Sequence, residues 1–243
     1  MILRGMRAVA DLILPRVCVV CGRKLLLNER HICLYCLSDM PFTYFWNQRC
    51  NSMADCLNDM LERDCLSESE RYAYAAALFF YHSEADYRHI PYQIKYHGNI
   101  DAGRFFGKML GKRLSGSKLF SDADAIIPVP LHWTRRWKRG YNQAEVIAQG
   151  MSEEMDVPVL TDILIRSRRT HTQTRLDIEE KSRNVHNAFK VHKCPPAGLR
   201  HVILVDDVFT TGSTLFACFT ALRSVFPPSV RISAATLAFV GKP

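Results

Sequence analysis

Residues 202–214 constrain the fold of this chain more than any other stretch, because an apolar run, two carboxylates and a glycine- and hydroxyl-rich turn follow one another without a break. The apolar run at 202–205 predicts a buried strand that ends at Asp206 and Asp207. The turn leads into residues 215–225, whose apolar side chains recur at helical spacing. This order predicts an α/β fold with a ligand site at the carboxyl end of the strand.

The turn after the acidic pair has the chemistry of a phosphate-binding loop. Its backbone N–H groups and the positive end of the next helix dipole would point at one spot, which suits a phosphate monoester. Gly212 lets the main chain come close to a ligand. Four hydroxyl groups can donate further hydrogen bonds: Thr210, Thr211, Ser213 and Thr214. Because Asp206 and Asp207 can accept from vicinal hydroxyls, the pattern predicts a ribose 5-phosphate as ligand.

The segment resembles the phosphoribosyl diphosphate (PRPP) signature of type I phosphoribosyltransferases, and its Asp-Asp-Val-x-Thr-Thr-Gly-x-Thr form is similar to the ComF family in particular. The resemblance implies a doubly wound, mostly parallel sheet of the type I phosphoribosyltransferase kind. It implies that Asp206 and Asp207 are catalytic and orient the ribose, while residues 210–214 bind the 5-phosphate of PRPP. It also implies Mg²⁺ between the diphosphate and the ribose hydroxyls.

Two other interpretations of the acidic pair stay open. Two carboxylates that end a strand can form a receiver-domain pocket, where they would hold Mg²⁺ for phosphoryl transfer, but that interpretation leaves the Thr-Thr-Gly-Ser-Thr turn unexplained. A purely structural loop is the second alternative. The context of strand, turn and helix favours the phosphoribosyl interpretation.

Four of the nine cysteines form two Cys-x-x-Cys pairs: Cys18, Cys21, Cys33 and Cys36. A tetrahedral zinc ion with four thiolate ligands needs two such pairs brought together by a short hairpin, and Gly22 predicts a turn after the first pair. A segment this short cannot bury a core of its own, and a structural zinc ion can supply about 10–16 kcal/mol of folding free energy. A redox Cys-x-x-Cys is the rival, but it would not explain two pairs.

Members of the ComF family carry a zinc-ribbon-like head on a phosphoribosyltransferase-like domain, and this chain is similar. With four thiolates available, we expect His31 to lie beside the zinc site without binding the metal. Cys50, Cys56 and Cys65 lack the paired spacing, and we expect them to be buried or surface thiols.

The chain divides into three expected parts. Residues 1–45 hold an amphipathic helix, ended by Pro15, and the zinc-ribbon-like module. Residues 46–74 are a connecting segment, and residues 75–243 form the phosphoribosyltransferase-like domain. Charged residues interrupt the apolar N-terminus, and no apolar run reaches the length of a membrane span, so we expect a cytoplasmic protein.

Further strands and a helix are expected around the acidic strand. Apolar runs predict strands at 72–81, 123–129, 157–160 and 230–237, and helical spacing predicts a helix at 144–155. Ligands of doubly wound sheets bind outside the carboxyl ends of the strands, so chemistry is expected in the loops there.

The first such loop follows a Pro-Val-Pro-Leu-His turn and carries four cations within five residues. Their repulsion is costly unless an anion or free solvation compensates it. By resemblance, the loop forms the diphosphate side of the site, with five candidate residues: Pro130, His132, Arg135, Arg136 and Arg139. A solvated basic face is the alternative. Trp133 and Trp137 could stack a base, but packing residues are the more common case.

The second loop, residues 166–183, is long, polar and rich in arginine and threonine. It suits a mobile lid that would keep water from a ribosyl cation, with Arg168 and Arg175 as candidate diphosphate ligands. We expect His171 to be an exposed loop histidine without a chemical role. Lys95 could approach the phosphates, although a scaffold role is the safer interpretation of its segment.

Two functions follow from these patterns. The resemblance implies a protein that binds PRPP with Mg²⁺ and transfers the phosphoribosyl group to a nitrogen acceptor that the sequence does not identify. The alternative is a non-catalytic module for nucleic-acid handling or DNA uptake, with single-stranded DNA or competence proteins as partners. The formal charge of +8 suits either anionic ligand.

Overall fold

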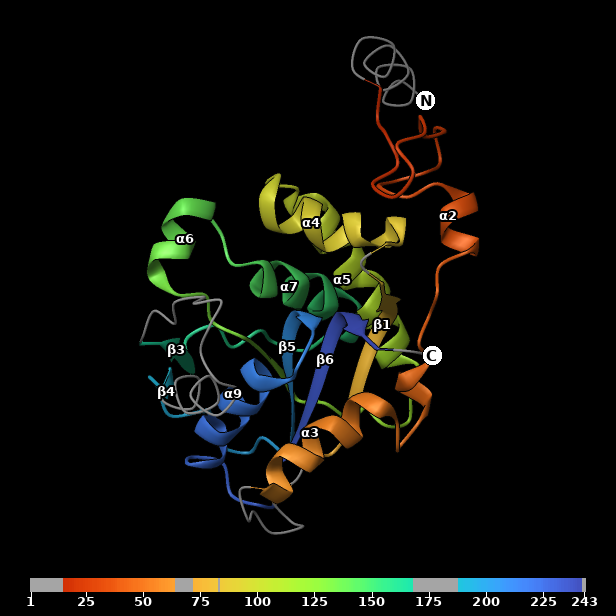
Figure 1. Cartoon of the computed structure of the whole chain (residues 1–243). Coiled ribbons are helices and arrows are strands. Elements are labelled where there is room, and N and C mark those ends of the chain that lie inside the picture. The colour runs from red at the N-terminus through yellow and green to blue at the C-terminus, as the bar shows by residue number, and fades with distance from the viewer. Residues whose placement is uncertain (1–14, 64–71, 83, 168–187, 242–243) are drawn as a thin grey trace.

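Four parallel strands form the central sheet of the protein, in the order β1-β6-β5-β2 (Figure 1). The computed structural model describes residues 15–63, 72–82, 84–167 and 188–241. The strands are β1 (Ala75–Tyr81), β2 (Ala125–Pro128), β5 (His201–Phe209) and β6 (Arg231–Val240). They are almost continuously apolar because parallel strands are buried on both faces. This arrangement confirms the predicted α/β, doubly wound parallel sheet.

Helices cover both faces of the sheet (Figure 1). On one side lie α5 (Ile100–Ser115) and α7 (Gln143–Met155), and on the other lie α3 (Ser52–Arg63) and α9 (Ser213–Arg223). Smaller elements surround them: α2 (Leu34–Ser38), η1 (Phe45–Asn47), η3 (Asp86–Arg88), α4 (His89–Tyr96), α6 (Trp133–Arg139), and the antiparallel pair β3 (Leu164–Arg166) and β4 (Phe189–Val191). None of the described helices is long and apolar enough to cross a membrane.

Two strand predictions need correction. Strand β5 does not end at the acidic pair, because Asp206 and Val208 still pair with β6 through Thr236 and Ala238. The expected strand at 157–160 is only an isolated parallel bridge between Val159 and Ile126. Pro158 lies inside that segment and has no N–H group, so a continuous ladder cannot form there.

The close approach of α5 and α7 depends on small residues. Three glycines recur every four residues along α5: Gly103, Gly107 and Gly111. A Cβ atom on Gly107 would overlap the carbonyl oxygen of Ile147, and one on Gly111 would lie 2.7 Å from the Cα atom of Met151. The α7 backbone therefore occupies the space that side chains would need, and it cannot move aside without disturbing β2 and β5 behind it.

A substitution of Gly107→Ala tests this packing. We expect it to lower the free energy of unfolding by about 1–3 kcal/mol, because the added methyl group meets backbone and not a flexible side chain. The matched control is Gly116→Ala, since Gly116 has an ordinary α conformation and its nearest neighbour would be 3.6 Å away. Urea unfolding of both variants measures the difference; equal stabilities would contradict the packing interpretation.

The expected connecting segment packs closely on the domain that follows it. Met53, Leu57 and Leu61 of α3 are fully buried. Upstream of that helix, Phe42 pairs with Phe79 of β1 in an antiparallel bridge. These residues complete the core on one side of the sheet. The domain boundaries at 45 and 74 stay a prediction, and the expected N-terminal helix lies largely outside the described residues.

A buried polar network closes the amino end of β5. The ring of His201 contacts Asp122 and Ser233, with both N–O distances at 2.8 Å. Burial is the main cause of the lowered pKa of His201, so the ring is neutral at neutral pH. Although serine, histidine and aspartate are in contact, His201 and Ser233 have no exposed surface. The network satisfies polar groups inside the core and is closed to a substrate.

Candidate ligand-binding site

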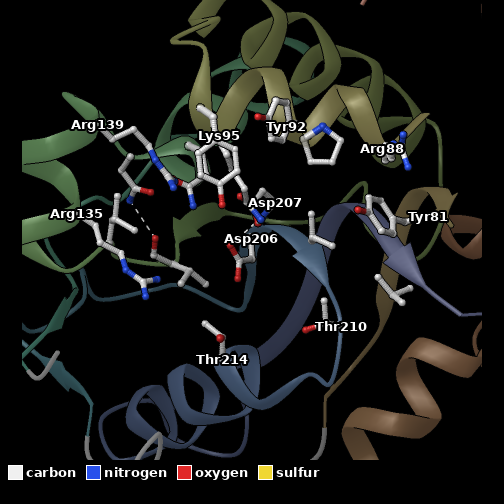
Figure 2. A pocket seen from close by; sticks show the side chains of 18 of the residues that line it. Tyr81, Arg88, Tyr92, Lys95, Arg135, Arg139, Asp206, Asp207, Thr210 and Thr214 are labelled. Carbon is white, nitrogen blue, oxygen red and sulfur yellow. Dashed lines mark hydrogen bonds and ion pairs between the residues drawn. The ribbon is translucent and has the colours of Figure 1, made fainter. Parts of the chain in front are cut away.

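A cavity of about 770 Å³ lies at the carboxyl ends of all four strands (Figure 2). Its wall includes Tyr81 from the end of β1, Pro130 after β2, Asp206 of β5 and Val240 from the end of β6. The edge of a doubly wound sheet is where such folds bind ligands. The sequence prediction of a site at this edge therefore agrees with the position of the cavity.

The two carboxylates at the centre of the cavity point in different directions. Because successive strand residues face opposite sides of a sheet, Asp207 lies toward α4 and Asp206 toward α9 (Figure 2). The Nζ atom of Lys95, on α4, lies 3.0 Å from Oδ1 of Asp207. The other oxygen, Oδ2 of Asp207, is buried and has no hydrogen-bond partner among the described residues. A ligand hydroxyl or a cation would satisfy it.

The charges of this pair are not fully compensated. Burial, and then the neighbouring charge of Asp207, raise the pKa of Asp206 to about 7, while Lys95 and Arg166 oppose the rise. For Lys95, burial disfavours the charged form, but the two carboxylates outweigh it and raise the pKa of the lysine. At neutral pH, Asp206 is therefore only partly ionised, and a further positive charge beside it would lower its pKa and favour the carboxylate.

The hydroxyl-rich turn forms a small hollow beside the main cavity. This hollow, of about 30 Å³, is lined by Asp206 and by residues 208–215. Gly212 has a φ of +77° and is the N-cap of α9, so the turn leads directly into the helix as the sequence predicts. The hydroxyl groups of Thr211 and Ser213 lie 3.0 Å apart, and Thr210 and Thr214 also line the main cavity. The predicted phosphate-binding residues are thus brought together at one helix N-terminus.

Only part of the predicted basic loop reaches the cavity. Arg135 and Arg139 of α6 point into it, and Pro130 lines it (Figure 2). His132 is buried instead and caps α6, accepting from the N–H group of Thr134. Arg136 lies outside the lining and pairs with a glutamate of α7, Glu145. Arg168, Arg175 and His171 lie outside the described residues, as does most of the expected lid.

Among the lining residues that the sequence analysis misses are Tyr92 and Tyr96 of α4 and Arg88 of η3. Two others come from segments that the sequence analysis considers, Lys95 of α4 and Arg166, the first residue of the expected second loop and the last of β3. The sequence analysis leaves Lys95 open between an approach to the phosphates and a scaffold role, and the structure places it in an ion pair with the acidic site. Nothing in the local sequence of α4 distinguishes this lysine, because its partner lies more than a hundred positions further along the chain.

The four paired cysteines form one cluster, as predicted. Their sulfur atoms all lie within 4.8 Å of one another. Gly22 has a φ of +71° and donates its N–H group to the carbonyl of Cys18, which forms the predicted turn. Burial opposes ionisation of Cys33, but the N–H group of Cys36 and the neighbouring thiols lower the pKa of Cys33 to about 7. The donor set and its geometry fit a tetrahedral metal ion.

His31, Cys50 and Cys56 lie outside the four-cysteine cluster. The ring of His31 packs on Phe105, 5.3 Å between centroids, and is not part of the cluster. Cys50 is exposed and Cys56 half-buried, and neither joins the four, while Cys65 lies outside the described residues. The module is tied to the rest of the protein by Tyr87, whose hydroxyl donates to the carbonyl of Cys36 over 2.8 Å.

The sheet, the acidic edge cavity and the cysteine cluster define a doubly wound α/β protein with an N-terminal four-cysteine module. Comparison with known proteins narrows this class. The chain is 41% identical over 113 residues to competence protein F of Haemophilus influenzae, a match that covers 45% of this chain and 48% of the relative. It is 38% identical over 104 residues to the DNA utilization protein YhgH of Escherichia coli K12, covering 43% and 44%. It is 27% identical over 106 residues to competence protein ComFC of Bacillus subtilis, covering 41% and 38%.

The chain is therefore a relative of competence protein F, YhgH and ComFC, which confirms the resemblance to the ComF family. The matched region spans slightly less than half the length of competence protein F and of YhgH. No family model matches it. Among solved structures, adenine phosphoribosyltransferase of Leishmania tarentolae superimposes with a TM-score of 0.35 and 12% identity, over 64% of this chain and 76% of that one. A similarity of this size assigns neither a ligand nor an activity.

Substitution of Asp206→Asn tests the electrostatics of the cavity. Because the folded-state pKa of Asp206 is raised to about 7, the folded protein holds this proton more tightly than the unfolded chain does. The free energy of unfolding of wild type therefore falls as the pH rises from the pKa of Asp206 in the unfolded chain toward its folded-state pKa of about 7. The uncharged variant escapes this loss, so we expect it to be more stable than wild type at pH 8, by roughly 1–3 kcal/mol, with a smaller difference at pH 5.

The control for this experiment is Asp124→Asn. Burial opposes ionisation of Asp124, but the N–H groups of Arg200 and His201 lower its pKa, so its loss should destabilise the protein at pH 8. Urea unfolding at pH 5 and pH 8 gives both differences. A less stable Asp206→Asn variant at pH 8 would contradict the assigned charge repulsion.

Proposed function

We propose that this chain is a DNA-utilization protein homologue whose edge cavity binds PRPP. The observation that carries the proposal is that Asp206, Asp207, Lys95 and four arginines line the main cavity, and that the turn at 210–214 lines an adjoining hollow. A ligand that fills this space needs a phosphate at one end, hydroxyl groups in the middle and further negative charge at the other end. PRPP has these three parts in that order.

Each part of PRPP has a counterpart in the cavity. The 5-phosphate fits the hollow at the N-terminus of α9, where backbone N–H groups and the helix dipole favour an anion. The ribose hydroxyls can donate to the acidic pair, including the unpartnered Oδ2 atom of Asp207. The diphosphate fits the side occupied by Arg135 and Arg139, where two guanidinium groups can bind its oxygens.

Magnesium is the metal that a diphosphate of this kind requires. The raised pKa of Asp206 and the unpartnered oxygen of Asp207 support a cation bound with the ligand near the acidic pair. When bound, the ion neutralises negative charge on the diphosphate. The residues of the chain do the rest: the turn holds the phosphate, and Asp206 and Asp207 hold the ribose.

Transfer of the phosphoribosyl group is the reaction that this arrangement would support. A nitrogen nucleophile would form a bond to C1′ as the bond from C1′ to the diphosphate oxygen breaks, and diphosphate would leave with the bonding electrons. Asp206 and Asp207 would favour the positive charge that develops on the ribose, and Arg135 and Arg139 would favour the departing anion.

The comparisons favour DNA handling over transfer as the role of the whole protein. The names of these three relatives refer to competence and to DNA utilization, and none refers to a transferase. A formal charge of +8 suits a nucleic-acid partner. We therefore propose that the cavity binds PRPP and that the protein handles DNA. Its partners would be single-stranded DNA or competence proteins. Catalytic turnover of PRPP is a separate question, which the experiment below addresses.

Calorimetric titration of PRPP with Mg²⁺ tests the cavity. Wild type should bind, and an Asp206→Asn/Asp207→Asn variant should bind roughly 100-fold more weakly, because two hydrogen bonds to charged groups are lost. Asp162→Asn is the matched control, since that carboxylate is exposed and pairs with Lys193 outside the cavity. Absence of binding to the folded wild type would refute the proposal. Diphosphate release with candidate acceptors then separates turnover from binding.

We also propose that the four-cysteine cluster holds one structural zinc ion. The sulfur donors and their proximity support zinc, because four thiolates within one small shell form the usual structural site. Glu29 is buried at the base of the module and accepts from the N–H groups of Leu26 and Leu34 over 2.7 and 2.8 Å. This carboxylate orders the hairpin backbone around the metal.

Substitution of Cys36→Ser tests the zinc site. We expect the variant to lose the bound zinc, measured as metal per protein by mass spectrometry, and to unfold at a lower temperature, because metal binding and folding of the module are coupled. Cys50→Ser is the control, since that thiol is exposed and outside the cluster. A Cys36→Ser protein with full zinc content would contradict the assignment.

A further inference from the structure

Helix α6 is a solvent-facing helix with an unusual composition. None of its seven residues is buried. Trp133 is 71% exposed and Trp137 is 86% exposed, although tryptophans of soluble proteins normally bury most of their surface. The sequence-based expectation that these two rings are packing residues is therefore wrong. Their exposure is a cost unless another molecule covers them.

The two faces of α6 have different surroundings. At about 100° per residue, Trp133 and Trp137 lie on one side of the helix, and Arg135 and Arg139 lie on the opposite side. The two arginines line the cavity, whereas the two tryptophans do not. His132 anchors the start of the helix, so the orientation of both faces is set. The tryptophan face consequently belongs to a second surface outside the cavity.

Cations flank the two tryptophans. Arg136 lies about 60° from Trp133 around the helix, and Glu145 holds its guanidinium group at 3.1 Å. Lys138 lies about 100° from Trp137 on the other edge, between the tryptophan face and the cavity face. A surface with two exposed indole rings between cations fits a polyanion that carries flat apolar groups. Single-stranded nucleic acid has this chemistry, because its bases are free to stack and its phosphates are charged.

We propose, on the basis of the DNA-handling function above, that the Trp133–Trp137 face of α6 binds single-stranded DNA. The two rings each stack on a base, and Lys138 contacts a phosphate. The two residues are separated by about 6 Å along the helix axis, four residues at about 1.5 Å each. Duplex DNA cannot offer its bases to them, since its bases are already stacked and paired.

An anionic membrane is the other surface that tryptophans and cations can bind. Helix α6 fits it poorly. Interfacial helices present a continuous apolar face, whereas five of the seven residues here are threonine or cationic. Only two apolar side chains are available, which is sufficient for two bases but not for stable insertion into a bilayer.

The test compares binding of a fluorescein-labelled oligo(dT) and of a blunt duplex of equal length to the zinc-loaded full chain. We expect wild type to prefer the single strand, and a Trp133→Ala/Trp137→Ala variant to lose at least about tenfold in affinity for it. A Trp133→Tyr/Trp137→Tyr variant should recover most of this loss, because tyrosine also stacks. Tyr35→Ala is the control, since Tyr35 is 72% exposed but lies on α2.

Two further measurements separate this surface from the cavity. Lys138→Gln should make the negative slope of log affinity against log salt concentration shallower by roughly 0.7, the magnitude for one phosphate contact on a single strand. The tryptophan variants should keep the PRPP affinity and unfolding temperature of wild type, because neither residue lines the cavity.

Three outcomes would overturn the proposal. If wild type binds the single strand and the alanine variant binds it equally well, the α6 surface is wrong while DNA handling survives. If wild type binds no single strand, both fail, whatever the cavity does with PRPP. If the tryptophans prove necessary only for binding to phosphatidylserine-containing vesicles, the surface is a membrane contact.

Discussion

Two like charges near the carboxyl end of a buried strand govern the organisation of this protein. Asp206 and Asp207 are adjacent on β5, and ionising both in a partly buried site is unfavourable. The surrounding elements bring positive charge toward them, Lys95 from α4 and Arg166 from β3. The compensation is incomplete, because Asp206 keeps a raised pKa and Oδ2 of Asp207 has no hydrogen-bond partner within the described part of the chain. A site with this imbalance binds cations and hydroxyl donors.

The position of that compensating lysine depends on packing far from the charges. Helix α4 leads directly into α5, and α5 lies against α7 at a distance that its glycines permit. The helix pair in turn packs on β2, β5 and the rest of the sheet. A close, rigid helix pair thus holds a flexible lysine near a carboxylate, so the chemistry at the edge depends on backbone contacts in the interior.

Helix α6 separates two kinds of surface with one short element. Its arginines face the cavity and its tryptophans face solvent, and the buried His132 fixes the start of the helix. A ligand in the cavity and single-stranded DNA on the tryptophan face would therefore contact α6 from opposite sides. This arrangement places the acidic cavity next to the surface that we propose for single-stranded DNA.

Local sequence was sufficient to predict features whose physical causes are local. The apolar run, the acidic pair and Gly212 specify a strand, a charged end and a turn with positive φ, and two Cys-x-x-Cys pairs specify a four-thiolate cluster. At 157–160 the predicted strand does not form, because Pro158 has no N–H group to continue the ladder. The strand β5 also ran further than predicted, because its length depends on the partner strand β6 as well as on its own residues.

Only the tertiary structure decided which distant residues share the site. Lys95 and Arg166 contribute to one charged cavity although they are separated along the chain by three helices and a strand. Likewise, Arg135 faces the cavity whereas Arg136 does not, a difference set by how α6 is oriented. Sequence periodicity predicts which residues share a helix face, because that follows from local geometry. Long-range packing determines which other elements that helix face contacts, and no local sequence pattern encodes this packing.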